Sequence, residues 1–219
     1  MNHIKKRHNP SASSSKPAKH AKASHQVRII GGEWKRTPLT VVDGEGLRPT
    51  PDRVRETLFN WLNHVWNGQW QQLSCLDVFA GSGALGFEAA SRGAKKVTMF
   101  EAFPAAFAQL QQVKEKLKAD QTHLQRGDAL VLLRSLIAKT DKFDVIFLDP
   151  PFNLGFLEKV LPLCVDLLEP NGVLYVESEQ AFASLATTQT MRWQVLREDK
   201  AGSVYFHLLQ RNTDSGEAA

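Results

Sequence analysis

Between residues 74 and 178 the sequence alternates short apolar segments with amphipathic ones, and this alternation restricts the possible folds more than any other feature. The apolar segments predict strands over 74–79, 96–101, 123–125, 143–148 and 172–178. The amphipathic segments predict helices over 84–92, 104–118, 129–137 and 157–168. Strands separated by helices need crossover connections, which produce a parallel sheet covered on both faces. The sequence therefore predicts an α/β fold.

The regions that flank this alternation contain strands of a different kind. Residues 193–196 and 203–210 have no helix between them and predict an antiparallel hairpin at one edge of the sheet. Upstream, 27–30 and 39–42 predict a small hairpin around a Gly-Gly turn. A helix with an apolar face should follow, with Pro51 at its first position.

The formal net charge of +4 belongs to the N-terminal tail. Residues 1–26 contain six lysines and arginines and no acid, so the remainder has 21 basic against 23 acidic residues. A segment this polar cannot bury enough surface to offset its ordering entropy, so we expect disorder over 1–26 and over 213–219. The tail is either an electrostatic arm for RNA or a solubilising extension. Between these ends we expect a hairpin-and-helix extension over 27–70 and a catalytic domain over 71–212.

The first strand of the alternation leads directly into a glycine-rich loop, Asp77–Gly86. Gly81, Gly83 and Gly86 match G-x-G-x-x-G, a pattern that lets the backbone turn tightly and approach a nucleotide at a helix N-terminus. Alone, this pattern fits NAD as well as S-adenosylmethionine. Asp77 favours S-adenosylmethionine, because a carboxylate there suits a cationic amino-acid group and would be badly placed beside a pyrophosphate.

Two further acids follow the next two strands. Glu101 ends the second strand, where an acid can bind both hydroxyls of a ribose. Asp128 follows the third strand, where it can accept from an adenine amine or, alternatively, cap the next helix. Together the acids favour S-adenosylmethionine as the cofactor. The candidate cofactor-binding residues are Asp77, Phe79, Gly81, Gly83, Glu101, Asp128 and Ala129.

The fourth strand ends in Asp149-Pro150-Pro151-Phe152, the candidate catalytic loop. An exocyclic base amine is a poor nucleophile because its lone pair is delocalised into the ring. The Asp149 carboxylate and the Pro150 carbonyl could accept both N–H bonds and aim the lone pair at a methyl sulfonium. Phe152 could stack on the extruded base. An ordinary Pro-rich turn is the alternative, but the position after the fourth strand of this sheet favours catalysis.

These motifs together resemble the class I methyltransferases that act on amino groups. Four segments resemble the bacterial ribosomal RNA small-subunit methyltransferase D family: Arg28–Gly32, Leu47–Leu62, Phe79–Gly86 and Tyr175–Glu179. The resemblance implies a Rossmann-like, seven-stranded sheet with strand order 3-2-1-4-5-7-6. It also implies S-adenosylmethionine-dependent methylation of N2 of one guanine, position 966, in 16S rRNA of the small ribosomal subunit or its assembly intermediate.

Residues that contact the RNA are sought among the arginines of the upstream segment. We expect Arg48 and Arg53 to make phosphate or cofactor-pocket contacts, because cations near a helix N-terminus oppose its dipole and need another reason to be there. Arg28 should extend the substrate-binding surface from the hairpin, and Phe152 should bind the base. The alternative for Arg48, Arg53 and Arg55 is a solvated position. Trp34 could stack on RNA or pack internally.

We further expect a cytoplasmic monomer without metal or membrane association. The two cysteines, Cys75 and Cys164, have no histidine at metal-ligand spacing, which favours buried thiols. No apolar run approaches the roughly 20 residues that span a bilayer.

Other activities remain possible for a chain with these motifs. DNA adenine-N6 methyltransferases use a similar loop but usually carry an additional target-recognition region. Glutamine-N5 methyltransferases of proteins typically begin the loop with Asn, where this chain has Asp149. An NAD-dependent oxidoreductase leaves Asp77 unexplained, and a non-catalytic RNA-binding module leaves Asp149 and Phe152 unexplained.

Overall fold

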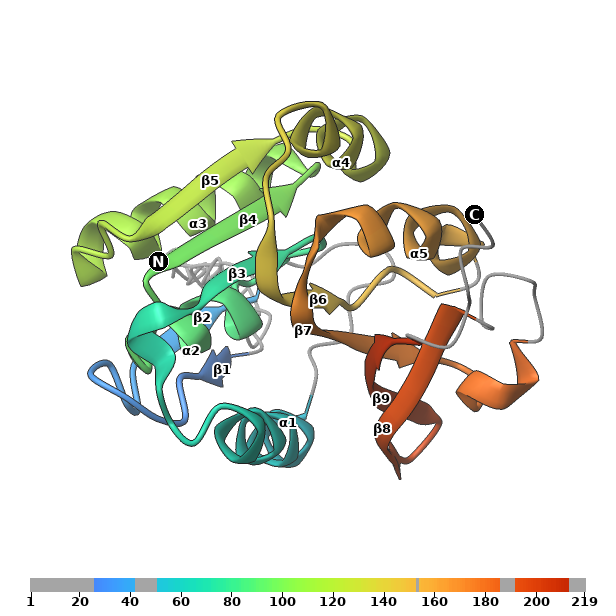
Figure 1. Cartoon of the computed structure of the whole chain (residues 1–219). Helices are drawn as coiled ribbons and strands as arrows, with labels where there is room; N and C mark the ends of the chain where they lie inside the picture. Colours follow the sequence, from blue (N-terminus) through green and yellow to red (C-terminus); the bar gives the residue numbers. More distant parts are fainter. Residues whose placement is uncertain (1–25, 42–50, 153, 186–191, 213–219) are drawn as a thin grey trace, which may run out of the picture.

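The computed structural model of the protein (Figure 1) describes residues 26–41, 51–152, 154–185 and 192–212. The role of Arg48 and the disorder expected over 213–219 lie outside the described residues, as does the disorder expected over 1–26 except at its last residue. Gln26 begins a strand, so the tail ends one residue earlier than expected. Among the described helices, none is long and apolar enough to cross a membrane. Cys75 and Cys164 are buried free thiols, as expected.

A mixed seven-stranded sheet forms the centre of the molecule. Its strands are β3 (Ser74–Asp77), β4 (Lys96–Glu101), β5 (Thr122–Arg126), β6 (Phe143–Leu148), β7 (Leu168–Ser178), β8 (Trp193–Ala201) and β9 (Val204–Arg211). They lie in the order β5-β4-β3-β6-β7-β9-β8. The first five are parallel, and β9 is antiparallel to both β7 and β8. The expected strand order, with a terminal hairpin at one edge, is confirmed.

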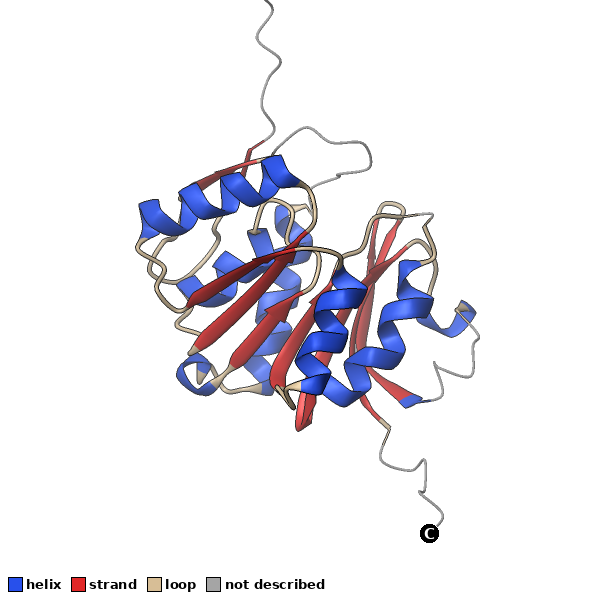
Figure 2. Cartoon of the chain, turned by 90° about the horizontal axis from the view of Figure 1, so that it is seen from above, coloured by secondary structure: helices blue, strands red, loops and turns tan. Residues whose placement is uncertain are grey.

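Helices cover both faces of the sheet (Figure 2). They are α1 (Asp52–Val65), α2 (Ala84–Ser91), α3 (Pro104–Leu117), α4 (Ala129–Ala138) and α5 (Phe156–Leu167). Helices α1, α2 and α3 bury apolar side chains in one core with Phe147 and Tyr175. Helices α4 and α5 do so in a second core with Ile146 and Val176. Alternate strand residues point to opposite faces, so each strand contributes to both cores.

Most element boundaries differ from the expected ones by a few residues, and three of these differences have a clear structural context. Helix α1 begins at Asp52, with Pro51 at the N-cap instead of the first helical position. Strand β7 begins at Leu168, which pairs with Phe143 before the register shifts. Strand β8 continues to Ala201, because it is paired with β9 along its length. Most of its residues are nevertheless exposed, and many are polar. An edge strand of this kind lacks the apolar pattern by which strands are predicted.

The predicted N-terminal hairpin is present and packs on the α/β body. Strands β1 (Gln26–Arg28) and β2 (Pro38–Thr40) pair antiparallel. Their apolar side chains, together with Ile29 and Val41, are buried in the same core as α1 and α2. The hairpin is therefore held by the core that also supports the central sheet.

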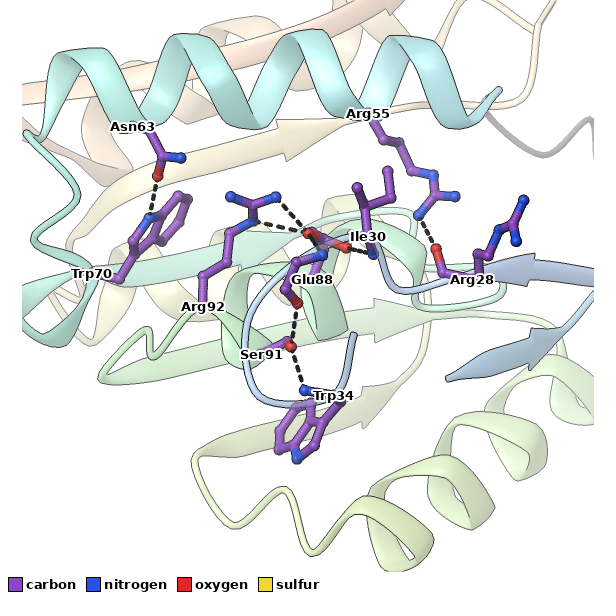
Figure 3. A network of polar contacts seen from close by, with 10 residues as sticks. Arg28, Ile30, Trp34, Arg55, Asn63, Trp70, Glu88, Ser91 and Arg92 are labelled. Carbon is purple, nitrogen blue, oxygen red and sulfur yellow. Dashed lines mark hydrogen bonds and ion pairs between the residues drawn. The ribbon is translucent and has the colours of Figure 1, made fainter. Parts of the chain in front are cut away.

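A fully buried carboxylate, Glu88 of α2, anchors this hairpin (Figure 3). Its Oε2 accepts from the Ile30 N–H at 2.6 Å, and its Oε1 accepts from the Gly31 N–H at 2.8 Å. Arg92 forms an ion pair with Oε1 at 2.8 Å. Because an unpaired buried charge is costly, these contacts allow Glu88 to lie inside the core while it binds the hairpin.

Ser91, one turn further along α2, binds the hairpin turn. Its Oγ donates to the Gly31 carbonyl at 2.6 Å and accepts from the Trp34 N–H at 2.9 Å. Its own carbonyl accepts from the Glu33 N–H at 2.8 Å. Gly32 has a left-handed φ of 73°, and a Cβ there would collide with the Ser91 backbone. The turn therefore needs glycine both for its conformation and for its close approach to α2.

Helix α1 joins this assembly through aromatic contacts. The Arg92 guanidinium lies over the Phe59 ring, 4.8 Å from its centroid. Phe59 also contacts Phe147 of β6, with the ring centroids 6.0 Å apart. At the other side of the helix Trp61 stacks on Phe206 of β9, with a centroid separation of 5.4 Å. Helix α1 therefore bridges the hairpin anchor and the antiparallel edge of the sheet.

We predict that Gly32→Ala destabilises the protein more than Gly68→Ala does. The two glycines have similar left-handed φ values of 73° and 71°, but a Cβ at Gly68 would meet nothing within 4 Å. Gly68→Ala should cost about 1 kcal/mol in the free energy of unfolding, from its backbone conformation alone. Gly32→Ala should cost about 1–3 kcal/mol more, from overpacking against α2. Urea unfolding measures both; equal losses would contradict the close docking of the hairpin.

Candidate active site

Carboxylates end three adjacent parallel strands on the face of the sheet that α2 covers. Asp77 of β3 is paired with Met99 of β4 and with Phe147 of β6. Two residues further along the neighbouring strands come Glu101 and Asp149, which the alternation of side chains places on the same face. Asp77 is thus one step inside the sheet edge, and the other two acids lie at the edge itself.

Asp77 is buried, with 1% of its surface exposed. Its Oδ2 accepts from the Gly86 N–H at 3.0 Å and so holds the first turn of α2 against β3. Burial, with smaller effects from the charges of Asp149 and Glu101, raises the pKa of Asp77 to about 7, although two backbone N–H groups lower it. The ionised form is therefore costly in the protein without a bound cation.

Glycine is needed at the three positions of the loop for different structural reasons. Gly81 and Gly83 both have left-handed φ values, 52° and 77°, and Gly83 is the N-cap of α2. A Cβ at Gly86 would overlap the Met99 side chain, so this glycine allows α2 to pack closely on β4. The tight turn expected from the sequence is present, and Gly86 serves packing between helix and strand.

Glu101 holds the loop from the neighbouring strand. Its Oε2 accepts from the Gly81 N–H at 2.8 Å, and its Oε1 accepts from the Phe103 N–H at 2.6 Å. Each carboxylate oxygen can accept more than one hydrogen bond, so these contacts are compatible with hydroxyl donors from a ligand. Glu101 is half-buried, which fixes the carboxylate while one side faces outward.

The remaining cofactor candidates lie around this loop. Asp128 is the N-cap of α4, where its Oδ1 accepts from the Val131 N–H at 3.1 Å. The capping alternative for Asp128 is therefore confirmed, and the contact with adenine stays a prediction. Ala129 is buried in the second core. Phe79 is half-buried and makes an edge contact with Phe156, with the ring centroids 5.5 Å apart.

The candidate catalytic loop follows β6, where β3 and β7 flank it. The Val78 N–H donates to the Phe147 carbonyl at 3.1 Å, which continues the β3–β6 pairing up to the loop. Pro150 is buried, whereas Asp149 and Phe152 are half-buried. The charge of Asp149 raises the pKa of Asp77 on one side and, with larger effects from burial and Glu177, the pKa of Tyr175 on the other. The Asp149 carboxylate therefore lies close to both flanking strands.

The candidate substrate arginines lie on the hairpin and on the start of α1. Arg28 has an exposed side chain whose Nε is 3.3 Å from Asp52 Oδ2. Arg53 is exposed. The backbone N–H of Trp34 binds α2, and its half-buried ring packs against the first core, so the packing alternative for Trp34 is the observed one.

Arg55 differs from the solvated position considered for it. Its side chain is fully buried, its Nη1 donates to the Arg28 carbonyl at 2.9 Å, and its Nη2 lies 2.6 Å from Asp52 Oδ1. The expectation of a solvated Arg55 is therefore wrong, because the hairpin covers this face of α1. Glu88 was also missed, although an acid within the apolar α2 sequence is the signal by which it could have been found.

Comparisons with known proteins point to one family. The family model described as "Conserved hypothetical protein 95" matches residues 27–210. The chain is 42% identical over 192 residues to "Ribosomal RNA small subunit methyltransferase D" of Haemophilus influenzae, covering 86% of this chain and 95% of the relative. It is 43% identical over 194 residues to the Escherichia coli protein of the same name, covering 86% and 91%. The solved structure of Escherichia coli yhhF is 41% identical, with a TM-score of 0.70 and coverage of 85% and 98%.

We predict that Asp77→Asn removes a pH dependence of stability. A folded-state pKa of about 7, against an ordinary value of 3.8, means that the folded protein binds more protons than the unfolded chain between these values. Wild-type stability should therefore fall relative to Asp77→Asn as pH rises from about 4 to 7, by on the order of a few kcal/mol, and then level off. Urea unfolding of both proteins at pH 5, 6, 7 and 8 measures this, and parallel curves would contradict it.

Proposed function

We infer, because the chain belongs to the ribosomal RNA small subunit methyltransferase D family, that it is an S-adenosyl-L-methionine-dependent enzyme that methylates an exocyclic amine of ribosomal RNA. The finer proposal is that this amine is N2 of a guanine in 16S rRNA. Its substrate is the small ribosomal subunit or an assembly intermediate. The enzyme would work in the cytoplasm as a monomer and without a metal ion.

The observation that carries this proposal is the group of carboxylates at one edge of the sheet. Asp77, Glu101 and Asp149 lie close enough for the charges of the last two to raise the pKa of Asp77. Carboxylates arranged in this way disfavour one another and favour a cation among them. A ligand that carries a sulfonium and an ammonium group would relieve this repulsion, whereas a pyrophosphate would increase it.

The residues present fit S-adenosyl-L-methionine. In this proposal Asp77 attracts the cationic amino-acid moiety, and Glu101 accepts from the ribose hydroxyls while it keeps the glycine loop in place. Asp128, at the start of α4, accepts from the adenine amine. Gly81 and Gly83 provide the turn that brings the backbone next to the ligand. When bound, this cofactor supplies a methyl group on a positively charged sulfur.

The catalytic loop would hold the amine that receives the methyl group. In this proposal the Asp149 carboxylate and the Pro150 carbonyl each accept one N–H of the amine, so its lone pair is directed at the methyl carbon. Pro150 and Pro151 have no N–H groups that could compete for these acceptors. Phe152 stacks on the base after it leaves its helix. The proton that the amine loses passes to a neighbouring carboxylate, for which Asp149 is placed.

RNA would approach across the hairpin and the start of α1. Arg28 and Arg53 present exposed cations there, and Arg48 precedes the same helix in the sequence. Phosphate contacts of this kind position a nucleic acid without reading its sequence. The N-terminal tail, with its six cations, could add further affinity that depends on salt.

We predict that Asp149→Ala lowers methyl transfer to small ribosomal subunits by at least about 100-fold, because the amine loses its charged acceptor. The assay follows labelled methyl groups from S-adenosyl-L-methionine into subunits that lack the modification. Asp166→Ala, an exposed aspartate on α5, is the matched control and should keep full activity.

Binding of S-adenosylhomocysteine, measured by calorimetry, should survive in Asp149→Ala. Retention of most activity by this variant would refute the amine-holding role. Label that enters DNA or protein, but not rRNA, would refute the substrate class.

We predict that Arg28→Ala and Arg53→Ala weaken RNA binding and leave cofactor binding unchanged. Each lost phosphate contact should reduce the slope of log affinity against log salt by about 1. Arg197→Ala on β8 is the matched control, because Arg197 is also exposed but lies on the edge strand of the large sheet, outside the hairpin and α1. Filter binding at several salt concentrations measures the slopes; unchanged slopes in both variants would exclude these arginines from the RNA surface.

A further inference from the structure

A fourth carboxylate, Glu177, lies beside the catalytic loop and has no role in the mechanism above. Leu148 of β6 is paired with Val176 of β7, so the residues that follow, Asp149 and Glu177, come at the same level on neighbouring strands. The side chain of Glu177 is on the face of β7 that also carries Tyr175. Only 2% of Glu177 is exposed.

Tyr175 fixes the orientation of this carboxylate. The phenol is fully buried, and its hydroxyl donates to Glu177 Oε1 at 2.8 Å. The ring of Tyr175 contacts Phe147 of β6, with the centroids 6.4 Å apart. Tyr175 and Glu177 therefore lie on the same face of the sheet as Phe147. Burial and the charges of Glu177 and Asp149 raise the pKa of Tyr175, so the hydroxyl remains a donor. Both carboxylates are therefore close to one phenol.

A carboxylate at this position interrupts an otherwise apolar strand. The preceding residues of β7, Val173, Leu174 and Val176, are buried and apolar, and an acid among such residues costs free energy unless it is hydrogen-bonded. The Tyr175 hydroxyl is one of the groups that hold this carboxylate, which can accept several hydrogen bonds at once. Near a base-binding loop, a fixed acceptor of this kind can read a hydrogen-bond donor on the base.

The three bases with an exocyclic amine differ in the atom next to it. In guanine the ring N1 beside the N2 amine carries a hydrogen and donates. In adenine the ring N1 beside the N6 amine accepts, and in cytosine the ring N3 beside the N4 amine accepts. Two adjacent carboxylates, one for the amine and one for the ring nitrogen, therefore match guanine and repel the lone pairs of the other two bases.

We propose that Glu177 is the residue that selects guanine, by accepting the N1–H of the base while Asp149 holds the N2 amine. This role rests on the proposed function, since it requires a guanine in the active site. Because only 2% of Glu177 is exposed, little water would compete with a bound base for this acceptor. Enzymes that extrude a base read its Watson–Crick edge in this way.

A base analogue that keeps the N2 amine but has an amine in place of O6, and so no hydrogen on N1, tests this role. Small subunits are reconstituted with 16S rRNA that carries either guanine or 2,6-diaminopurine at the methylated position. Diaminopurine keeps the N2 amine, but its ring N1 accepts instead of donating. The wild-type enzyme should prefer guanine in kcat/KM by at least about 100-fold, because a site built for a donor rejects an analogue that lacks it.

The Glu177→Gln variant is then compared with the wild type in its kcat/KM preference for guanine over diaminopurine. The glutamine amide can donate to the diaminopurine N1, so the preference should fall at least about tenfold from the wild-type value. Intrinsic differences in reactivity between the two bases cancel in this comparison. Glu179→Gln, the same change two residues further along at an exposed position, is the matched control and should keep the wild-type preference. Tyr175→Phe should lower the preference partly, since it removes the hydroxyl that orients Glu177.

An equal loss of activity on both bases in Glu177→Gln, with the preference unchanged, would overturn the proposal, because a purely structural role predicts that result. Equal wild-type rates on the two bases would overturn it as well. Methylation of guanine N2 by the wild-type enzyme in the same assay tests the proposed function separately, so a failure of Glu177 is distinguishable from a failure of that function. S-adenosylhomocysteine binding by each variant checks that its fold is retained.

Discussion

The parallel register of β4, β3, β6 and β7 is the constraint on which the site depends. It brings the carboxyl ends of these four strands to one edge of the sheet, with Asp77 one step inside and Glu101, Asp149 and Glu177 at the edge. Burial, and to a smaller extent the like charges of Asp149 and Glu101, raise the pKa of Asp77. The apolar cores on both faces hold the strands in register against this repulsion. In our account these carboxylates bind a cationic cofactor, one N–H of the amine and the ring N1–H of the base.

Helix α2 connects this edge to the N-terminal extension. Its first turn carries the glycine loop and donates the Gly86 N–H to Asp77. Its last turns bind the hairpin through Glu88 and Ser91, with Arg92 as the counter-ion of the buried acid. One short helix thus fixes both the cofactor loop and the element that presents Arg28. The proposed RNA surface is therefore held in a defined position relative to the proposed catalytic loop.

The sequence predicted the features that depend on local patterns. The α/β alternation, the glycine turn and the terminal hairpin follow from periodicity and turn residues, and the structure confirms them. Buried charges were not predictable in this way. Glu88 is buried because it binds residues 57 and 58 positions away, and Arg55 is buried because the hairpin covers it. Contacts between segments so far apart in the sequence leave no periodic signal. A charged residue on a helix is therefore predicted to be solvent-exposed until its partner is known.

The central claim is that the four carboxylates direct methyl transfer to the N2 amine of a guanine in 16S rRNA. The most direct measurement is the identity of the product nucleoside. Small ribosomal subunits are treated with the enzyme and labelled S-adenosyl-L-methionine, the rRNA is digested, and the nucleosides are separated by chromatography and identified by mass spectrometry. The account predicts that the label appears as N2-methylguanosine from 16S rRNA. Label in N6-methyladenosine, or in a methylated cytidine, would contradict it.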